Sequence, residues 1–530
     1  MPDASLPAVR LLGDLVDRWR AEARLIGHAH EAGAGPGEPD LAAIELTGVR
    51  DDSRSVEPGN LFVAVRGLRV DGHDFVAQAV DQGAVAVALE EPIRHLAVPQ
   101  LIVGRGASAL ASAAAWWHGD ASRELLTVGV TGTNGKTTTS FLARAALEAA
   151  GLQTGLVGTI GIGIGGELRR NEEPNTTPGA LDLQRLLREM RGAGEEAVVI
   201  ETSSHGLAAD RVGSVAYDAA IFTNLSHEHL DFHGTFEAYR DAKLSLFTRL
   251  PRAAKERRPG LAVINADDGH GSMFADAALE SGARVLTYGG AAGADVRLVS
   301  IQADASGSRF EVSIEGGGTL AATLPIAGRY NANNALAVLA LAHGWGLDLG
   351  PVVEAFAAFP GVPGRMEVIS RGQPFAVVVD YAHTPKSIDA VAGELRALVE
   401  PSGGSVISVF GASGERDVGK RPLMGEAAAR HSRLVIVTED DSRGEDPELI
   451  YEEVAAGAEG AGMRRRENLL VIADRRQAIA QAFAQAKPGD VVLIAGKGHE
   501  TWNMGPKGPE PWSDRQAAID LLGHNRWRPG

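Results

Sequence analysis

Short apolar runs and amphipathic segments alternate along most of this 530-residue chain. The runs at residues 61–65 and 84–89 are apolar throughout and indicate buried strands, with turns and one helix between them. From residue 375 onward, five apolar runs alternate with helical segments. Such β/α alternation predicts a parallel sheet with functional residues at the strand ends. The pattern therefore predicts an α/β protein.

Breaks in this pattern divide the chain into three predicted domains. The first α/β module ends near residue 120, and the Gly- and Pro-rich stretch at residues 359–366 is typical of a hinge. We therefore predict domains at residues 1–121, 122–363 and 364–530. The glycines at 161, 163 and 166 have the spacing of a dinucleotide-binding loop, but no helix follows them, so they predict a hairpin.

Composition excludes several classes of function. The net charge of −17 argues against nonspecific binding to nucleic acid or acidic membranes, which depends on Lys and Arg. The absence of Cys excludes disulfides, cysteine zinc sites and a thiol nucleophile. No apolar run approaches the about 18 residues of a membrane span, and the first residues lack a signal-peptide core. We expect a cytoplasmic monomer that binds small molecules.

The clearest chemical signal is a glycine-rich loop between a strand and a helix, TVGVTGTNGKTTTS at residues 127–140. Loop amides and a helix N-terminus favour phosphate oxygens, a lysine adds a mobile cation, and Thr137 is placed to bind Mg²⁺. The strict phosphate-loop pattern fails at Val130, which stands where it requires glycine. The predicted nucleotide contacts are Gly132, Thr133, Asn134, Gly135, Lys136, Thr137 and Thr138.

Two further residues suggest a metal site. Glu201 follows four apolar residues at a predicted strand end, where a buried carboxylate needs a cation. The next predicted strand leads to three histidines, at positions 227, 229 and 233, without the spacing of a zinc protease motif. We expect His229 to reach the Mg²⁺. Lys243 lies among apolar residues of a predicted helix, and this pattern alone favours a lysine with its amine in solvent.

Other polar residues stand at helix starts and strand ends. Residues 175–177 open one helix, where they either cap it or meet a phosphate. Asn331 and Asn334 share one face near the start of another helix. Arg416, Arg443 and Glu500 follow predicted strands of the third domain and indicate a binding edge. The turn around Ser53 is explained by turn chemistry alone.

These motifs together resemble the Mur ligase family from about residue 47 to residue 500. They include DSRSVEPGNLFVA, TGTNGKTT, NTTP, ETSSHGL, TNLSHEHLD, YRDAKLSLF, GRYNANNALA, GVPGRME, DYAHTP, GERDVGKRPLM and GKGHE, in that order. The resemblance implies a small N-terminal α/β domain that binds a UDP-linked substrate. It also implies a central P-loop ATPase-type sheet domain and a C-terminal Rossmann-like domain that binds an amino acid.

The resemblance implies an ATP-dependent amide ligase that adds the third amino acid to UDP-N-acetylmuramoyl-L-alanyl-D-glutamate through an acyl phosphate. ATP and Mg²⁺ are the implied cofactors, and carbon dioxide is implied as a carbamate on Lys243. The implied catalytic residues are Lys136, Glu201, His229 and Lys243, and the implied metal ligands are Thr137, Glu201, His229 and the carbamate. Asn331, Asn334, Arg365 and Asp380 match nucleotide contacts, and Ser53, Asn175, Thr176, Thr177, Ser203 and Arg211 match contacts of the UDP-linked substrate.

The sequence does not decide which amino acid the implied ligase adds in the third position. Family members that add meso-diaminopimelate usually carry DNPR, where this chain has Asp440, Asp441, Ser442 and Arg443. Arg443 and Arg416 suit a distal carboxylate and favour diaminopimelate. Asp441 adds negative charge and favours a side-chain ammonium, as in L-lysine or L-ornithine. Gly496 and Glu500 complete the implied substrate-binding set.

Two alternative functions do not involve this reaction. One is a ligase similar to folylpolyglutamate synthetase, which the DSRSVEPG turn disfavours because it matches UDP-muramoyl binders. The other is a muropeptide-binding protein without catalysis, which the presence of Lys136, Glu201, His229 and Lys243 disfavours.

Overall fold

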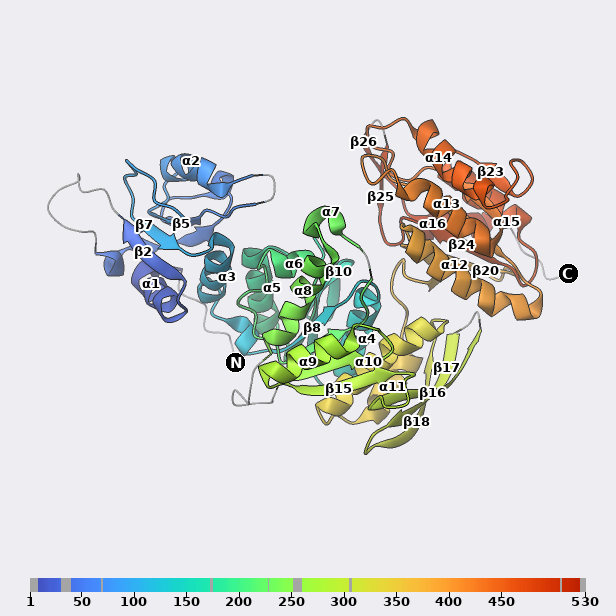
Figure 1. Cartoon of the computed structure of the whole chain (residues 1–530), viewed down its shortest axis with the longest axis horizontal. Coiled ribbons are helices and arrows are strands. Elements are labelled where there is room, and N and C mark those ends of the chain that lie inside the picture. The colour runs from blue at the N-terminus through green and yellow to red at the C-terminus, as the bar shows by residue number, and fades with distance from the viewer. Residues whose placement is uncertain are drawn as a thin grey trace. The chain divides into compact units, whose positions relative to one another are not determined.

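The computed structural model describes residues 8–29, 40–67, 70–171, 175–226, 228–250, 260–304, 307–505 and 508–524. The chain divides into two compact units, Met1–Arg297 with Leu336–Val352 and Leu298–Ala335 with Val353–Gly530 (Figure 1). We describe each unit by itself. The three predicted domain boundaries stay predictions.

A five-stranded sheet in the order β2-β7-β6-β5-β4 forms the start of the first unit. Its strands are parallel except β2, which pairs antiparallel with β7. Leu15 and Trp19 of α1 are fully buried among its core residues. The elements are β1 Arg10–Leu11, α1 Leu12–Ala21, β2 Leu25–Ala29, β3 Glu45–Leu46, β4 Gly48–Arg50, β5 Asn60–Val63, α2 Val76–Asp81, β6 Ala86–Leu89, β7 Gln100–Val103 and α3 Gly106–Trp117.

The larger sheet of the first unit runs in the order β11-β10-β9-β12-β8-β13-β14-β15. Strands β9, β12, β8, β13, β14 and β15 are parallel, and β10 and β11 form the antiparallel hairpin predicted from the glycines. The elements are β8 Leu126–Thr131, α4 Lys136–Ala149, β9 Thr154–Val157, β10 Gly161–Ile164, β11 Glu167–Arg170, α5 Ala180–Gly192, β12 Ala197–Glu201, α6 Ser204–Ala208, β13 Ala219–Phe222, α7 Leu230–His233, α8 Phe236–Thr248, β14 Leu261–Asn265, α9 Gly271–Ser281 and β15 Arg284–Gly289.

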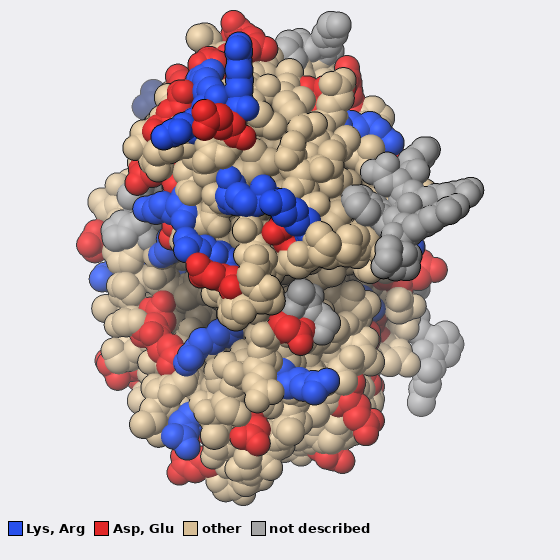
Figure 2. Space-filling model, turned by 90° about the vertical axis from the view of Figure 1, so that its right-hand side faces the viewer, with Lys and Arg blue, Asp and Glu red and all other residues tan. Residues whose placement is uncertain are grey.

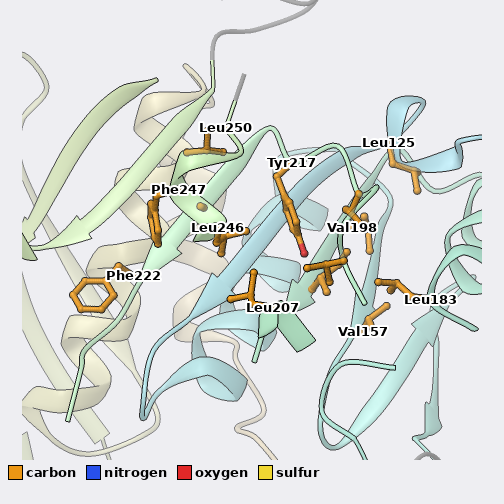
Figure 3. Close-up of a cluster of buried hydrophobic side chains, with 14 of the residues drawn as sticks. Leu125, Val157, Leu183, Val198, Leu207, Tyr217, Phe222, Leu246, Phe247 and Leu250 are labelled. Carbon is orange, nitrogen blue, oxygen red and sulfur yellow. The ribbon is translucent and has the colours of Figure 1, made fainter. Parts of the chain in front are cut away.

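Strands and helices pack together in the core of this sheet. Val198 of β12, Phe222 of β13 and Leu246 of α8 belong to one buried cluster (Figure 3). Because parallel strands are buried on both faces, their sequences are nearly continuous apolar runs. Their polar residues are therefore concentrated at the strand ends, where the candidate site lies.

The second unit contains a six-stranded sheet in the order β19-β20-β24-β21-β22-β23. It is parallel, as predicted, except for the short antiparallel edge strand β19. The elements that lie wholly or partly in this unit are β16 Val296–Asp304, β17 Gly307–Ile314, β18 Gly318–Leu324, α10 Arg329–Gly344, α11 Leu349–Ala357, β19 Glu367–Val368, β20 Ala376–Asp380, α12 Pro385–Val399, β21 Val406–Phe410, α13 Lys420–His431, β22 Ser432–Val437, α14 Pro447–Gly460, β23 Leu469–Val471, α15 Arg475–Gln485, β24 Val491–Ala495, β25 Trp502–Gly505, β26 Gly508–Pro511 and α16 Asp514–His524.

Helices cover both faces of this six-stranded sheet. Helices α12, α13 and α14 share one buried cluster with the strands, and α15 and α16 share another. Within β20, Val378 belongs to the first cluster, while Val377 and Val379 belong to the second. This alternation has the period of two that a strand requires. The result is a doubly wound α/β layer, the C-terminal Rossmann-like arrangement that the resemblance implied.

On the face drawn in Figure 2, acidic and basic side chains lie close together in many places, and no single basic field covers that face. No helix among the described residues is long and apolar enough to cross a membrane.

Candidate active site

The predicted phosphate loop joins β8 to α4, as the sequence indicated. Gly132 and Gly135 have φ angles of 151° and 85°, which favour glycine. A Cβ atom at Gly132 would also collide with the hydroxyl of Thr223. The Lys136 amine donates to the carbonyl oxygens of Gly132 and Thr133, both at 2.9 Å. The lysine therefore lies against the loop where a phosphate is expected.

A second segment, absent from the predicted site, holds this loop in place. The Thr223 hydroxyl donates to the Asn134 carbonyl at 2.6 Å, and the Asn134 amide donates to the Asn224 side chain at 3.0 Å. Both residues follow β13, the strand beside β8. The motif TNLS was visible in the sequence, but its contact with the loop depends on strand order.

Glu201 ends β12, as predicted, and its side chain is fully buried. Its carboxylate accepts hydrogen bonds from the Thr137 hydroxyl at 3.0 Å and from the Thr159 amide and hydroxyl at 3.1 and 3.0 Å. Thr159 was not predicted, because it lies in a glycine-rich turn without a recognisable signal. Carboxylate and hydroxyl oxygens together are the hard donors that Mg²⁺ prefers, so these residues fit that ion.

Lys243 is 2% exposed, so the expectation that its amine reaches solvent is wrong. The amine instead donates to the Gly132 carbonyl at 2.7 Å and lies 4.7 Å from the Tyr239 ring centre. Burial lowers the pKa of Lys243 well below its usual value, and Lys136 lowers it further while Glu228 opposes them. The amine is therefore biased toward its neutral form.

Tyr239 lies one helical turn before Lys243 and contacts the same loop. Its hydroxyl and the Thr133 hydroxyl are 2.9 Å apart, and Thr133 also accepts from the Ser226 amide at 2.9 Å. One face of α8 thus holds residues 132 and 133 of the phosphate loop. Sequence reasoning treated Tyr239 only as an apolar helix position.

Two histidines after β13, His229 and His233, contact the ring of His205. His229 has a φ of 56°, and its ring lies 4.7 Å from the His205 ring, with its Nε2 4.0 Å from a Glu228 oxygen. Its metal role stays a prediction. His227 lies outside the described residues. Among the described residues, no group of three or more His, Asp or Glu is arranged to hold a metal ion.

The residues matched to the UDP-linked substrate belong to the first unit, where Thr177, Ser203 and Arg211 share hydrogen bonds. The Thr177 hydroxyl donates to the Glu201 carbonyl at 2.8 Å and lies 3.0 Å from the Ser203 hydroxyl. Arg211 donates to the Thr177 carbonyl at 2.9 Å. Thr176 lies 3.0 Å from Thr159, Asn175 accepts from Asn171 through its carbonyl, and Ser53 is 5% exposed and donates to Gln78 at 3.0 Å.

The other predicted nucleotide contacts belong to the second unit. The Asn331 side chain donates to the Ala327 carbonyl at 2.8 Å, and Asn334 donates to Asn331 at 3.4 Å. Asp380 accepts from the amides of residues 366 and 382, both at 2.8 Å. Burial raises the pKa of Asp380, although Arg365 opposes this. Arg365 itself lies 4.6 Å above the Tyr381 ring centre.

The residues matched to the third amino acid surround a lysine that was not predicted. Lys497 is fully buried, and its amine lies 2.8 Å from Asp441, 2.9 Å from Glu500 and 3.7 Å from Asp440. Burial raises the pKa of Asp440 to about 6 against the opposing effect of Lys497. We call Asp440, Asp441, Glu500 and Lys497 the acidic cluster. Gly496 leaves room for it, because a Cβ there would collide with Asp440.

The arginines beside this cluster differ in exposure. Arg416 is exposed, whereas Arg443 is half-buried. Within the described part of the chain, the Nε of Arg443 and the hydroxyl of Ser442 are buried without a hydrogen-bond partner. Buried polar groups are nearly always paired in proteins, so these two groups are available to a further polar partner.

Comparison with known proteins gives three family matches along the chain. The models described as "Mur ligase family, catalytic domain", "Mur ligase middle domain" and "Mur ligase, glutamate ligase domain" match residues 45–115, 130–342 and 364–498. Together they cover the phosphate loop and three of the four residues of the acidic cluster, because Glu500 lies just beyond the third match.

Individual relatives are similar over nearly the whole chain. A UDP-N-acetylmuramyl-tripeptide synthetase of Roseiflexus sp. (strain RS-1) is 47% identical over 486 residues, 90% of this chain and 94% of that protein. A UDP-N-acetylmuramoyl-L-alanyl-D-glutamate–2,6-diaminopimelate ligase of Geobacillus thermodenitrificans (strain NG80-2) is 42% identical over 469 residues, 88% and 92% of the two chains. A solved structure of a ligase with this second name aligns with a TM-score of 0.67 and 31% identity over 94% of this chain and 98% of its own.

Proposed function

Because this chain belongs to the Mur ligase family of ATP-dependent, ADP-forming amide ligases, we propose that it acts in peptidoglycan synthesis by joining meso-diaminopimelate to UDP-N-acetylmuramoyl-L-alanyl-D-glutamate. The observation that carries this proposal is the buried Lys243 of α8, which contacts the phosphate loop at Gly132, together with Thr137 at the end of that loop, which pairs with Glu201. This arrangement suits phosphoryl transfer to a carboxylate. The monomeric state and cytoplasmic location expected from the sequence belong to the same proposal.

The first step brings two anions together. The D-glutamate side-chain carboxylate attacks the γ-phosphorus of ATP, the bond to the β-phosphate oxygen breaks, and ADP leaves. Lys136 and the loop amides hold the phosphates and offset their charge. Oxygens of Thr137 and Glu201 would hold Mg²⁺, which when bound would supply further positive charge at the transferring phosphate. The incoming amine then attacks the acyl phosphate, and the tetrahedral intermediate releases inorganic phosphate.

Lys243 is proposed to carry a carbamate. A neutral amine attacks carbon dioxide, forms an N–C bond and loses one proton, so a cation becomes an anionic oxygen ligand. An ammonium has three N–H donors, but among the described residues the Gly132 carbonyl is the one hydrogen-bond acceptor near the Lys243 amine. A carbamate retains a single N–H, which matches that one acceptor. The lowered pKa favours the neutral amine that this reaction needs.

Diaminopimelate is favoured as the third amino acid because Arg443 offers a buried, unpartnered Nε within the described part of the chain. A guanidinium pairs with a distal carboxylate in two parallel hydrogen bonds. L-lysine and L-ornithine lack that carboxylate. They remain the second choice because Asp441 adds negative charge to the acidic cluster.

The test is phosphate release from ATP and Mg²⁺ in the presence of UDP-N-acetylmuramoyl-L-alanyl-D-glutamate and each of the three diamino acids. Release is expected to require both substrates, with the highest kcat/KM for meso-diaminopimelate. Release with a folate and glutamate alone would instead identify a folylpolyglutamate synthetase. Binding of the UDP-linked substrate without any release would identify a muropeptide-binding protein.

A further inference from the structure

Lys497 has an unusual environment for a lysine outside the phosphate site. Its side chain is fully buried, yet three carboxylates approach its amine within 4 Å. It follows β24, and Asp440 and Asp441 follow β22. Removing a charge from water is unfavourable unless partners replace the solvent. Here the partners come from two strand ends of one sheet.

Asp441 is the partner with the most protein contacts. The carboxylate oxygen that lies 2.8 Å from the Lys497 amine also accepts from the Met504 amide at 2.7 Å. The Asp441 amide donates to the Asn503 side chain at 3.1 Å. Through these bonds, Asp441 connects its loop to β25 and to Lys497.

The same loop carries Arg443, and its backbone is strained there. Asp441 and Arg443 have φ angles of 51° and 55°, in the left-handed region. Aspartate tolerates this region, whereas it costs a longer side chain about 1 kcal/mol or more. The Arg443 amide donates to the Met504 carbonyl at 2.7 Å. The contacts of Asp441 with Met504 and Lys497 therefore lie next to the strained residue and help to fix it.

We propose that Lys497 is a positioning residue that pairs with Asp441, so that the carboxylate at position 441 shapes the loop carrying Arg443 and does not select an ammonium on the incoming amino acid. This inference rests on the proposed ligase function. It identifies the substrate class as amino acids with a distal carboxylate, because Asp441 is already paired within the protein, whereas Arg443 of the same loop has a buried Nε without a hydrogen-bond partner among the described residues.

The central test compares selectivity, the kcat/KM for meso-diaminopimelate divided by that for L-lysine. Asp441→Asn keeps an oxygen that can accept from both Lys497 and Met504 and removes only the charge. If Asp441 is paired internally, the ratio changes by less than about twofold. If Asp441 selects an ammonium, the ratio rises about tenfold or more, and the inference is overturned.

A second variant removes the lysine. Lys497→Met leaves Asp441 and Glu500 without their cation, and the ratio is expected to fall about tenfold as the site gains preference for a cationic side chain. Adding Asp441→Asn to this variant removes part of the excess charge and should restore much of the ratio. A fall that the second substitution does not reverse would show a general packing defect and overturn the inference.

Controls separate this inference from the proposed function. Glu467→Gln removes a carboxylate that is 67% exposed on the same unit and should leave the ratio at its parent value. If Lys497→Met does not fold, as judged by circular dichroism, Asp441→Asn alone decides. Absence of phosphate release by the parent with every diamino acid would overturn the proposed function and the inference together. Normal release with an altered Asp441→Asn ratio would overturn only the inference.

Discussion

The phosphate loop and the acidic cluster both lie at strand ends, but their charged groups have different kinds of partner. Around the phosphate loop, a few charged groups are held by backbone carbonyls and hydroxyls, as Lys243 is by Gly132 and Glu201 is by Thr137 and Thr159. In the acidic cluster, ionisable side chains contact one another directly, with three carboxylates near Lys497. At the phosphate loop, charged side chains are held by the dipoles of neutral groups. In the acidic cluster, they are held by side chains of opposite charge.

This difference explains why the partners of a charged side chain are easier to predict from the sequence at the phosphate loop than in the acidic cluster. A backbone carbonyl is present at every residue, so the loop motif itself supplies the partners of Lys136. An ionised side chain needs a counterion, and the partner of Asp441 lies 56 residues away in the sequence. The role of a charge in the acidic cluster therefore depends on contacts that only the fold supplies.

The largest expected effect is at the phosphate loop. Lys243→Ala should lower kcat by about 10⁴-fold, because the proposed carbamate and its contribution at the transferring phosphate are lost. Added acetate or formate should restore part of the rate by supplying a carboxylate to the vacated space. The control is Lys487→Ala, which removes an exposed lysine and should keep the parent rate. Activity of Lys243→Ala near that of the parent would contradict the carbamate.

Much of the fold could be predicted, because strands such as β8, β12 and β13 are apolar runs with polar ends. The strand, loop and helix around Lys136, the strand-end position of Glu201 and the glycine hairpin were confirmed, while phosphate binding by the loop stays a prediction. The failures have one cause. The helical pattern alone favoured a solvent-exposed Lys243 amine, and Thr159, Tyr239 and Lys497 were missed, because helical spacing and local turns do not reveal which distant carbonyl or carboxylate a side chain meets.

The next largest effect concerns ion pairing in the second unit. Arg475 donates to both oxygens of Asp514 at 2.7 Å, and the Asp514 side chain is fully buried. Arg475→Met leaves that buried carboxylate without its cation and should lower the free energy of unfolding by about 3–5 kcal/mol. The neighbouring Arg476 is 45% exposed and lies 3.6 Å from Asp520, so Arg476→Met should cost about 0.5 kcal/mol or less. Urea denaturation measures both, and equal losses would refute the distinction.

Ionisation of Asp440 in the acidic cluster should make the free energy of unfolding depend on pH. The pKa of Asp440 is raised by burial from 3.8 to about 6. Between these values the folded chain keeps a proton that the unfolded chain has lost, so the contribution of Asp440 to stability falls as pH rises. Asp440→Asn should therefore be more stable than the parent above pH 6, by on the order of 1–3 kcal/mol, with the gain vanishing near pH 4.

A pH-independent difference between Asp440→Asn and its parent would place the effect in packing and not in ionisation. Denaturation at matched pH values from 4 to about 8 distinguishes the two outcomes, because only the ionised carboxylate costs stability in this buried position.

The smallest expected effect compares one tyrosine hydroxyl in each region. Tyr239→Phe removes a neutral hydrogen bond to Thr133, while Thr133 keeps its bond from Ser226. This should cost about 1 kcal/mol of unfolding free energy. Tyr451→Phe removes a hydroxyl that donates to the Glu439 carboxylate, near the acidic cluster. A hydrogen bond to an ionised group is roughly twice as strong, so about 2 kcal/mol is expected there. Equal losses in urea denaturation would show that the two strand-end regions do not differ in how strongly a single hydrogen bond holds them.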